Sequence, residues 1–221
     1  MVSPLQTRFV ALCGRLAPAA SPEGAELAFL VLESLYAHGG SGPRLHHTLR
    51  HVAECLEALD LGRAHAEHAD EVEFALYAHD AVYDAKRKDN EARSAAVAAM
   101  LLHDLGAAPG VNERVCRLIE ATSHARPGED RDAQLMIDVD LSILGSESGR
   151  YDEYAVAIRK EYAFADDALY RTGRCAFLRT MLARPAIFTV GALRERFEGA
   201  ARRNMGVELG SLAPAPAAGA R

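Results

Sequence analysis

A histidine and an aspartate interrupt a helix face that is otherwise apolar. If residues 71–83 form a helix, one stripe at i, i+3, i+4 and i+7 spacing carries Val72, Ala75, Leu76, His79, Asp80 and Tyr83. Such a stripe faces a core, where an uncompensated carboxylate is costly. A divalent cation would compensate the charge, because imidazole nitrogen and carboxylate oxygen are both good metal ligands. The pattern therefore predicts a buried metal site within a helical fold.

The rest of the sequence favours helices. Ala and Leu are abundant, runs of Val, Ile and Thr are scarce, and Trp is absent. Helical patterns cover residues 21–38, 44–59, 64–83, 90–105, 111–122, 132–144, 151–162, 173–183 and 192–205. Because the connections are short and strand-like alternation is absent, we expect a single all-α domain over residues 1–210. Residues 211–221 read SLAPAPAAGAR, which predicts a disordered tail.

Charge and apolarity argue against several classes of protein. The formal net charge is −6, which disfavours a protein that coats a nucleic-acid polymer. A small anionic substrate stays compatible with this charge, since a metal ion supplies local positive charge. Residues 1–16 do not resemble a signal peptide, and no apolar run approaches the ~20 residues of a membrane helix. The four cysteines form no C-x-x-C pair and are expected to be reduced thiols. We therefore expect a cytoplasmic protein with no membrane partner.

Further residues of metal-binding type flank the His-Asp pair. His47 and His51 are four residues apart, so on one helix both side chains leave the same face. Downstream, Asp138 and Asp140 compete for the last ligand position. Asp140 lies deeper in an apolar stripe, so we favour it, with Asp138 as an acceptor that orients a ligand histidine. Two histidines and two carboxylates without thiolate suit a divalent metal ion, whether Mn²⁺, Mg²⁺, Fe²⁺, Ni²⁺, Co²⁺ or Zn²⁺.

In this order, His51, His79-Asp80 and Asp140 resemble the H…HD…D pattern of the HD-domain metal-dependent phosphohydrolases. Residues 47–51 (HTLRH) resemble the His-Asn-x-x-His segment of cyclic-nucleotide phosphodiesterases in that superfamily, and residues 139–142 (VDLS) resemble their Ala-Asp-Leu-Ser segment. Over roughly residues 25–208 the chain is most similar to a bacterial group of predicted HD phosphohydrolases. The similar pieces are HTLRH (47–51), AHDAVYD (78–84), DNEARSA (89–95), ATSH (121–124), DVDLSILG (138–145), IRKEY (158–162) and ARRNM (201–205).

This resemblance implies an HD-domain-like helical bundle that hydrolyses a phosphoester with metal-activated water. It assigns four metal ligands: His51, His79, Asp80 and Asp140. Asp80 would also be catalytic, because it could bridge two metal ions or hold the attacking water. His47 would act as the general acid that protonates the leaving oxygen.

Five further side chains are candidates for binding the substrate. Arg44, Lys86 and Arg159 would hold phosphate charge, although Lys86 also fits a solvated loop and Arg159 a surface pair with Glu161. Glu91 is equally well a substrate-contacting carboxylate or a charge that complements a helix N-terminus. His124 lies in the Thr-x-His piece of the resembled group and would touch metal or substrate.

The tyrosines on the 151–162 helix, Tyr151, Tyr154 and Tyr162, are expected to serve packing and not base stacking.

The leading hypothesis is a metal-dependent phosphohydrolase for a small phosphorylated, nucleotide-like substrate, with a homodimer as one possible assembly. A non-catalytic metal- and nucleotide-binding module on the same scaffold is the alternative, and it predicts binding without product. In a third hypothesis the metal only stabilises the fold. Without any metal, His79 and Asp80 would form a partly buried ion pair with Arg50 or Lys86.

Overall fold

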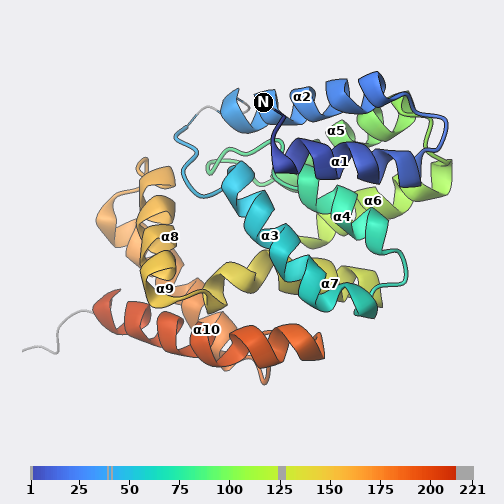
Figure 1. Ribbon diagram of the computed structural model, residues 1–221. Coiled ribbons are helices and arrows are strands. Elements are labelled where there is room, and N and C mark those ends of the chain that lie inside the picture. Colours follow the sequence, from blue (N-terminus) through green and yellow to red (C-terminus); the bar gives the residue numbers. More distant parts are fainter. Residues whose placement is uncertain (1, 39, 41, 124–127, 213–221) are drawn as a thin grey trace, which may run out of the picture.

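Helices follow one another along the whole of the chain that the computed structural model describes, which is residues 2–38, 40, 42–123 and 128–212 (Figure 1). Within these ranges it contains no strand, so the predicted all-α fold class is confirmed. None of the described helices combines the length and the apolarity that crossing a bilayer requires. The α-helices are α1 Pro4–Leu16, α2 Pro22–His38, α3 Leu49–Gly62, α4 Ala69–Ala78, α5 Asn90–Asp104, α6 Pro109–Ala121, α7 Arg131–Asp140, α8 Ser148–Glu161, α9 Asp167–Ala183 and α10 Gly191–Leu212. Two 3₁₀ helices, η1 Arg63–His65 and η2 Leu141–Gly145, follow α3 and α7.

Several helices begin at side chains that cap free backbone N–H groups. Ser3 accepts the N–H of Gln6 at 3.1 Å, and Pro4 occupies the first position of α1. Asp130 and Asp166 cap α7 and α9 in the same way. The helices expected from the sequence did not include α1, although Ser3-Pro4 carries the same start signal as Ser21-Pro22.

Helix α4 lies in the middle of the bundle. All its residues from Glu71 to Ala78 are buried, and it packs against α1, α3, α5, α6 and α7. The run EVEFALYA explains this position, because its apolar residues go round the whole helix. One hydrophobic core contains buried residues from every α-helix, α1 through α10.

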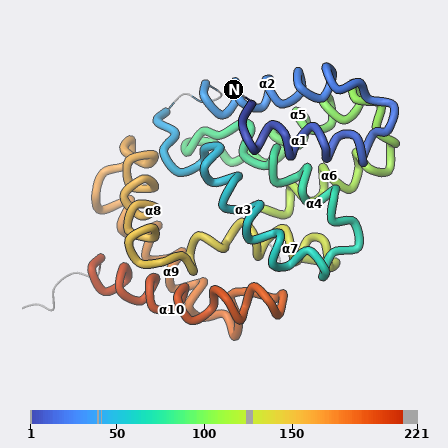
Figure 2. Tube along the Cα trace, in the orientation of Figure 1, coloured from blue at the N-terminus to red at the C-terminus, as the bar shows by residue number. Residues whose placement is uncertain are grey.

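Helix α10 lies along the edge of the bundle opposite α2, as Figure 2 shows. Helix α10 packs against α3, α9 and η2. Its contact with η2 depends on Gly145, since a Cβ there would lie 2.5 Å from Cβ of Phe197. This close approach fixes the segment that immediately follows Asp140.

Several predicted helix boundaries are wrong: α9 begins at Asp167 instead of residue 173, α10 ends at Leu212 instead of residue 205, and the helix expected over 132–144 ends at Asp140. Two further differences change the positions of predicted site residues. The helix expected over 44–59 begins only at Leu49, so His47 lies in the preceding loop. There the backbone N–H groups of residues 45–47 donate to the Glu161 carboxylate instead of entering a helix. The helix expected over 64–83 is interrupted after η1 and ends at Ala78, so His79 and Asp80 follow its last turn.

At the C-terminus, Ser211 and Leu212 belong to α10, whereas the rest of the predicted tail lies outside the described residues.

Candidate metal centre

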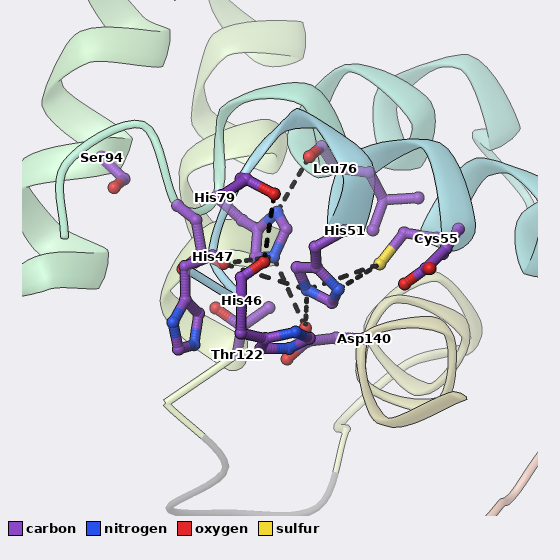
Figure 3. Close-up of polar contacts among 12 residues, drawn as sticks. His46, His47, His51, Cys55, Leu76, His79, Ser94, Thr122 and Asp140 are labelled. Carbon is purple, nitrogen blue, oxygen red and sulfur yellow. Dashed lines mark hydrogen bonds and ion pairs between the residues drawn. The ribbon is translucent and has the colours of Figure 1, made fainter. Parts of the chain in front are cut away.

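Four side chains from three segments converge inside the bundle, and Figure 3 labels three of them, His51, His79 and Asp140. His51 comes from the first turn of α3, His79 and Asp80 follow α4, and Asp140 ends α7. Ligand atoms of His51, His79 and Asp140 all lie within 4.8 Å of one another. Asp140 Oδ1 is 3.0 Å from Nε2 of His51 and 3.4 Å from Nε2 of His79. Asp80 Oδ2 lies 3.1 Å from Nε2 of His79 and 3.9 Å from Nε2 of His51. Such spacings suit ligand atoms around a cation with bonds of roughly 2.0–2.3 Å.

The orientation of His79 fits a metal ligand. Its Nδ1–H donates to the Leu76 carbonyl oxygen at 2.8 Å, which leaves Nε2 with the lone pair of the neutral ring. Nε2 is buried and has no hydrogen-bond partner among the described residues. An unsatisfied buried polar group costs about 1–3 kcal/mol, and a cation would remove this penalty. Metal-binding histidines commonly donate their other ring N–H to a carbonyl in this way.

The electrostatics of the cluster favour added positive charge. Burial opposes ionisation of Asp80, but the imidazoles of His79 and His47 outweigh it and hold the pKa of Asp80 well below its ordinary value. Burial also opposes a charged His79, yet the carboxylates of Asp80 and Asp140 raise the pKa of this ring well above its ordinary value. Both shifts have one origin, which is attraction between the acids and a positive charge. A proton supplies that charge in one state and a divalent cation would supply it in another.

The two cations that could have paired with Asp80 have other partners. Arg50 pairs with Glu54 at 3.2 Å and with Glu153 at 3.0 Å. Lys86 Nζ lies 5.4 Å from the ring centre of Phe164. Asp80 is therefore paired with His79, at 3.1 Å, and the contacts of Arg50 and Lys86 in the described residues do not include Asp80.

The carboxylate of Asp138 has partners different from those of Asp140. Its Oδ2 accepts the backbone N–H groups of Thr189 and Val190, both at 2.6 Å, and it thereby fixes the segment that leads into α10. Burial raises the pKa of Asp138 to about 6. The structure brings Asp140 and not Asp138 to the two histidines, and the recorded contacts of Asp138 involve no ligand histidine.

His47 is held beside the cluster by a buried acid. Its Nδ1 lies 2.6 Å from Oε2 of Glu161, and its ring stacks on Tyr83 with ring centres 3.8 Å apart. The Glu161 side chain is fully buried, and its Oε1 accepts the backbone N–H groups of residues 45–47. Burial favours neutral His47, but Asp80 and Glu161 outweigh it and raise the pKa of His47.

Sequence reasoning missed Glu161, which it treated only as a surface partner of Arg159. A signal was present, since Tyr154, Ile158 and Glu161 share one helical stripe at spacings of four and three. An acid on that apolar stripe required a buried partner.

A cavity of about 620 Å³ opens beside the cluster. At the cluster it is lined by His46, His47, His79, Asp80 and Asp140. His46 was not singled out from the sequence, although it is only 5% exposed and its Nδ1 has no hydrogen-bond partner in the described part of the chain. Burial lowers the pKa of His46 well below its ordinary value, so its ring is neutral.

Arg44 lies close to the cluster but does not line this cavity. Its guanidinium donates to the backbone carbonyls of Leu35 at 3.0 Å, His47 at 2.7 Å and Ala81 at 3.3 Å, and also to that of Asp80. We call this set of bonds the Arg44 clip. It joins the end of α2, the loop before α3 and the turn after α4.

The other predicted substrate-binding residues differ in their placement. Glu91 lines the cavity, as do Tyr154 and Tyr162, which were expected only to pack. Lys86 lines a separate cavity of about 150 Å³.

Arg159 binds the carbonyls of Tyr162 and Ala165 and the carboxylate of Asp167. His124 lies outside the described residues.

Comparisons with protein-family models, with curated proteins and with solved structures find no match to this chain. The HD-domain resemblance accordingly stays a prediction from the sequence. The interpretation of the site as a candidate metal centre depends on geometry alone. Imidazole nitrogens and carboxylate oxygens lie close together at one end of a cavity.

Proposed function

We propose that this protein is a divalent-metal-dependent phosphohydrolase of the HD-domain type, which acts in the cytoplasm on a small phosphorylated, nucleotide-like substrate. The observation that carries the proposal is the buried Nε2 of His79. This atom has no hydrogen-bond partner among the described residues, yet it lies 3.1 Å from Asp80 and 3.4 Å from Asp140 at the end of a cavity. A site built only for packing would have no reason to keep such a group unsatisfied.

The cation would be held by His51, His79, Asp80 and Asp140, a donor set that suits Mn²⁺, Mg²⁺, Fe²⁺, Ni²⁺, Co²⁺ or Zn²⁺. When bound, such an ion lowers the pKa of water and offsets the charge of a phosphoryl group. The Nδ1–H bond from His79 to the Leu76 carbonyl fixes the tautomer of the neutral ring, so that Nε2 would carry the lone pair offered to the ion.

Two side chains would handle the protons of the hydrolysis. As a bond forms between the attacking water oxygen and phosphorus, the water proton passes to the carboxylate of Asp80. The bond from phosphorus to the leaving oxygen breaks, and this oxygen takes a proton from His47. Glu161 and Tyr83 position the His47 ring, and the carboxylate of Glu161 favours its protonated form.

The test uses the full chain, stripped of metal by a chelator and reloaded with single divalent ions. Each form is offered a panel of phosphomonoesters, phosphodiesters and nucleotides while phosphate release is measured. We expect turnover only with metal, and we expect Asp80→Ala to abolish it. Asp104→Ala, an exposed substitution on α5, is the matched control and should leave turnover unchanged.

Undiminished turnover in Asp80→Ala would contradict the proposal. Tight binding of phosphorylated ligands without product under every metal would favour the non-catalytic module. Stabilisation by metal without any phosphate binding would favour a purely structural ion.

A further inference from the structure

The cavity beside the cluster has two chemically different halves. At one end lie the imidazoles and carboxylates of the metal centre. The rest of the lining includes a group of aromatic side chains on α8, α9 and the connection between them, which we call the aromatic half: Tyr154, Tyr162, Phe164, Tyr170 and Phe177. A volume of about 620 Å³ is within the range of small-molecule pockets and exceeds what a phosphate group needs. The aromatic half therefore has room for the rest of a substrate.

The aromatic half offers little positive charge to a second phosphate. Besides histidine, the basic residues that line the cavity in the described ranges are Arg87 and Arg174. Arg174 is already bound to Glu208, through contacts of 2.8 and 2.9 Å, and it donates to the hydroxyl of Tyr154 at 3.0 Å. Arg87 forms two contacts of 2.6 Å with Asp89 at the surface. Sites that bind polyphosphates depend on cations available to the phosphate oxygens, and these two guanidinium groups are engaged by carboxylates.

One buried polar atom lies where the two halves meet. The ring of His46 lies beside that of His51 (Figure 3), with ring centres 4.5 Å apart, and its centre is 4.7 Å from that of the Tyr154 ring. Its Nδ1 is buried and has no partner among the described residues. A ligand that spans both halves would pass this atom and can supply its missing hydrogen bond.

We propose that the aromatic half binds an uncharged aromatic ring, so that the preferred substrate carries a single phosphoryl group on a molecule with such a ring. The substrate assignment rests on the proposed phosphohydrolase function, whereas the ligand preference can be tested without turnover. Aromatic side chains favour a ring through apolar burial and through edge and stacking contacts. A second phosphoryl group in this half would lose its hydration without gaining a free cation.

Binding is measured first, by isothermal titration calorimetry of the Co²⁺-loaded full chain with three phosphonates that cannot be hydrolysed. Methylphosphonate carries no ring, benzylphosphonate adds the ring, and 1,4-xylylenediphosphonate adds a second charged group to that ring. We expect benzylphosphonate to bind at least tenfold more tightly than methylphosphonate, and the diphosphonate to lose most of this gain. Equal affinities of the first two ligands, binding of neither, or tightest binding of the diphosphonate would overturn the proposal.

Variants then locate the ring. Phe177→Ala should weaken benzylphosphonate at least fivefold and leave methylphosphonate unchanged. If this variant does not fold, Tyr162→Leu makes the same test from the connection between α8 and α9. Val156→Ala is the control, because Val156 lies on α8 but is 54% exposed and does not line the cavity. An identical response of the control and the cavity variant would overturn the assignment of the ring to this half.

Turnover separates this inference from the function on which it builds. Phenethyl phosphate and ethyl phosphate, both alkyl esters, are compared for phosphate release by the metal-loaded protein. If both are hydrolysed with equal kcat/KM, the inference is wrong and the proposed function survives. If neither is hydrolysed while benzylphosphonate binds as expected, the ligand preference holds and the hydrolytic function is wrong.

Discussion

Helix α4 places two buried polar side chains in contrasting surroundings. Glu73, in the middle of the helix, is 1% exposed and has three guanidinium partners: Arg8 at 2.7 Å, Arg15 at 3.7 Å and Arg63. His79, just after the helix, is 2% exposed, and its Nε2 has no hydrogen-bond partner in the described chain. The chain surrounds the first group with three counter-charges, whereas the described residues supply no hydrogen bond to Nε2 of the second.

The comparison teaches how a buried polar group reveals its role. An ion pair that the protein completes by itself holds elements together, here α1, η1 and α4. A buried lone pair that the protein surrounds with further ligands but does not satisfy indicates a site for an external partner. If this distinction is correct, substitutions at the two places should affect different measurements.

The largest effect is expected in the cluster around His79, whose Nε2 has no hydrogen-bond partner among the described residues. Asp140→Ala should lower kcat/KM for a phosphoester by at least about 10⁴-fold, or about 5 kcal/mol, because loss of a direct ligand exceeds the 10- to 100-fold cost of losing an outer partner. Metal content by elemental analysis should fall together with activity, while the metal-free protein should unfold at nearly the same urea concentration. If Asp140→Ala retained both metal and activity, the distinction drawn between His79 and Glu73 would be wrong.

The second largest effect is expected at Glu73, which has three guanidinium partners. Glu73→Gln should lower the free energy of unfolding by about 3 kcal/mol, because it leaves three arginines without their buried counter-charge. Urea denaturation gives this value, and metal content should be unchanged. A loss of metal in Glu73→Gln, or a loss of stability below about 1 kcal/mol, would remove the contrast between the two ends.

A smaller effect is expected at Glu161, which positions His47. Glu161→Gln should lower kcat about 10- to 100-fold with little change in KM. Because the carboxylate of Glu161 helps to raise the pKa of His47, its removal lowers that pKa. Activity that requires protonated His47 falls as pH rises through this pKa, so the alkaline fall should move to lower pH in the variant. An unmoved alkaline limb in the pH–rate profile would exclude His47 as the general acid.

The smallest effect is expected at Asp60, which shares Arg8 with Glu73 but is exposed. Arg8 contacts Asp60 at 2.7 Å, and the Asp60 side chain is 53% exposed. Asp60→Asn should change the free energy of unfolding by less than about 1 kcal/mol, since solvent screens exposed ion pairs. A change as large as that of Glu73→Gln in the same urea experiment would show that burial is not what separates the two acids.

The fold class was predictable because it depends on local patterns. Helix-forming composition, apolar spacing and start signals such as Ser21-Pro22 act within a few residues of the chain. The boundaries next to the site were not predictable in this way. Residues 45–47 stay outside α3 because Glu161, more than 110 residues away in the sequence, accepts their N–H groups.

The same division applies to the site. His51, His79, Asp80 and Asp140 could be singled out from residue type and order, and the structure brings them together. Glu161 and His46 could not be singled out, since their burial arises from packing between segments distant in sequence. Arg44 has the charge expected of a phosphate ligand, yet backbone carbonyls occupy its guanidinium, and sequence spacing does not reveal such acceptors.

The Arg44 clip has a consequence for the order in which the protein assembles. One planar guanidinium binds carbonyl oxygens from α2, from the loop before α3 and from the turn that carries Asp80, a geometry that lysine cannot reproduce. A newly made chain in which α2 has not yet docked would therefore lack the framework that aligns this turn. Binding of the proposed metal ion should then be the last event of maturation, and it should depend on the completeness of the whole bundle.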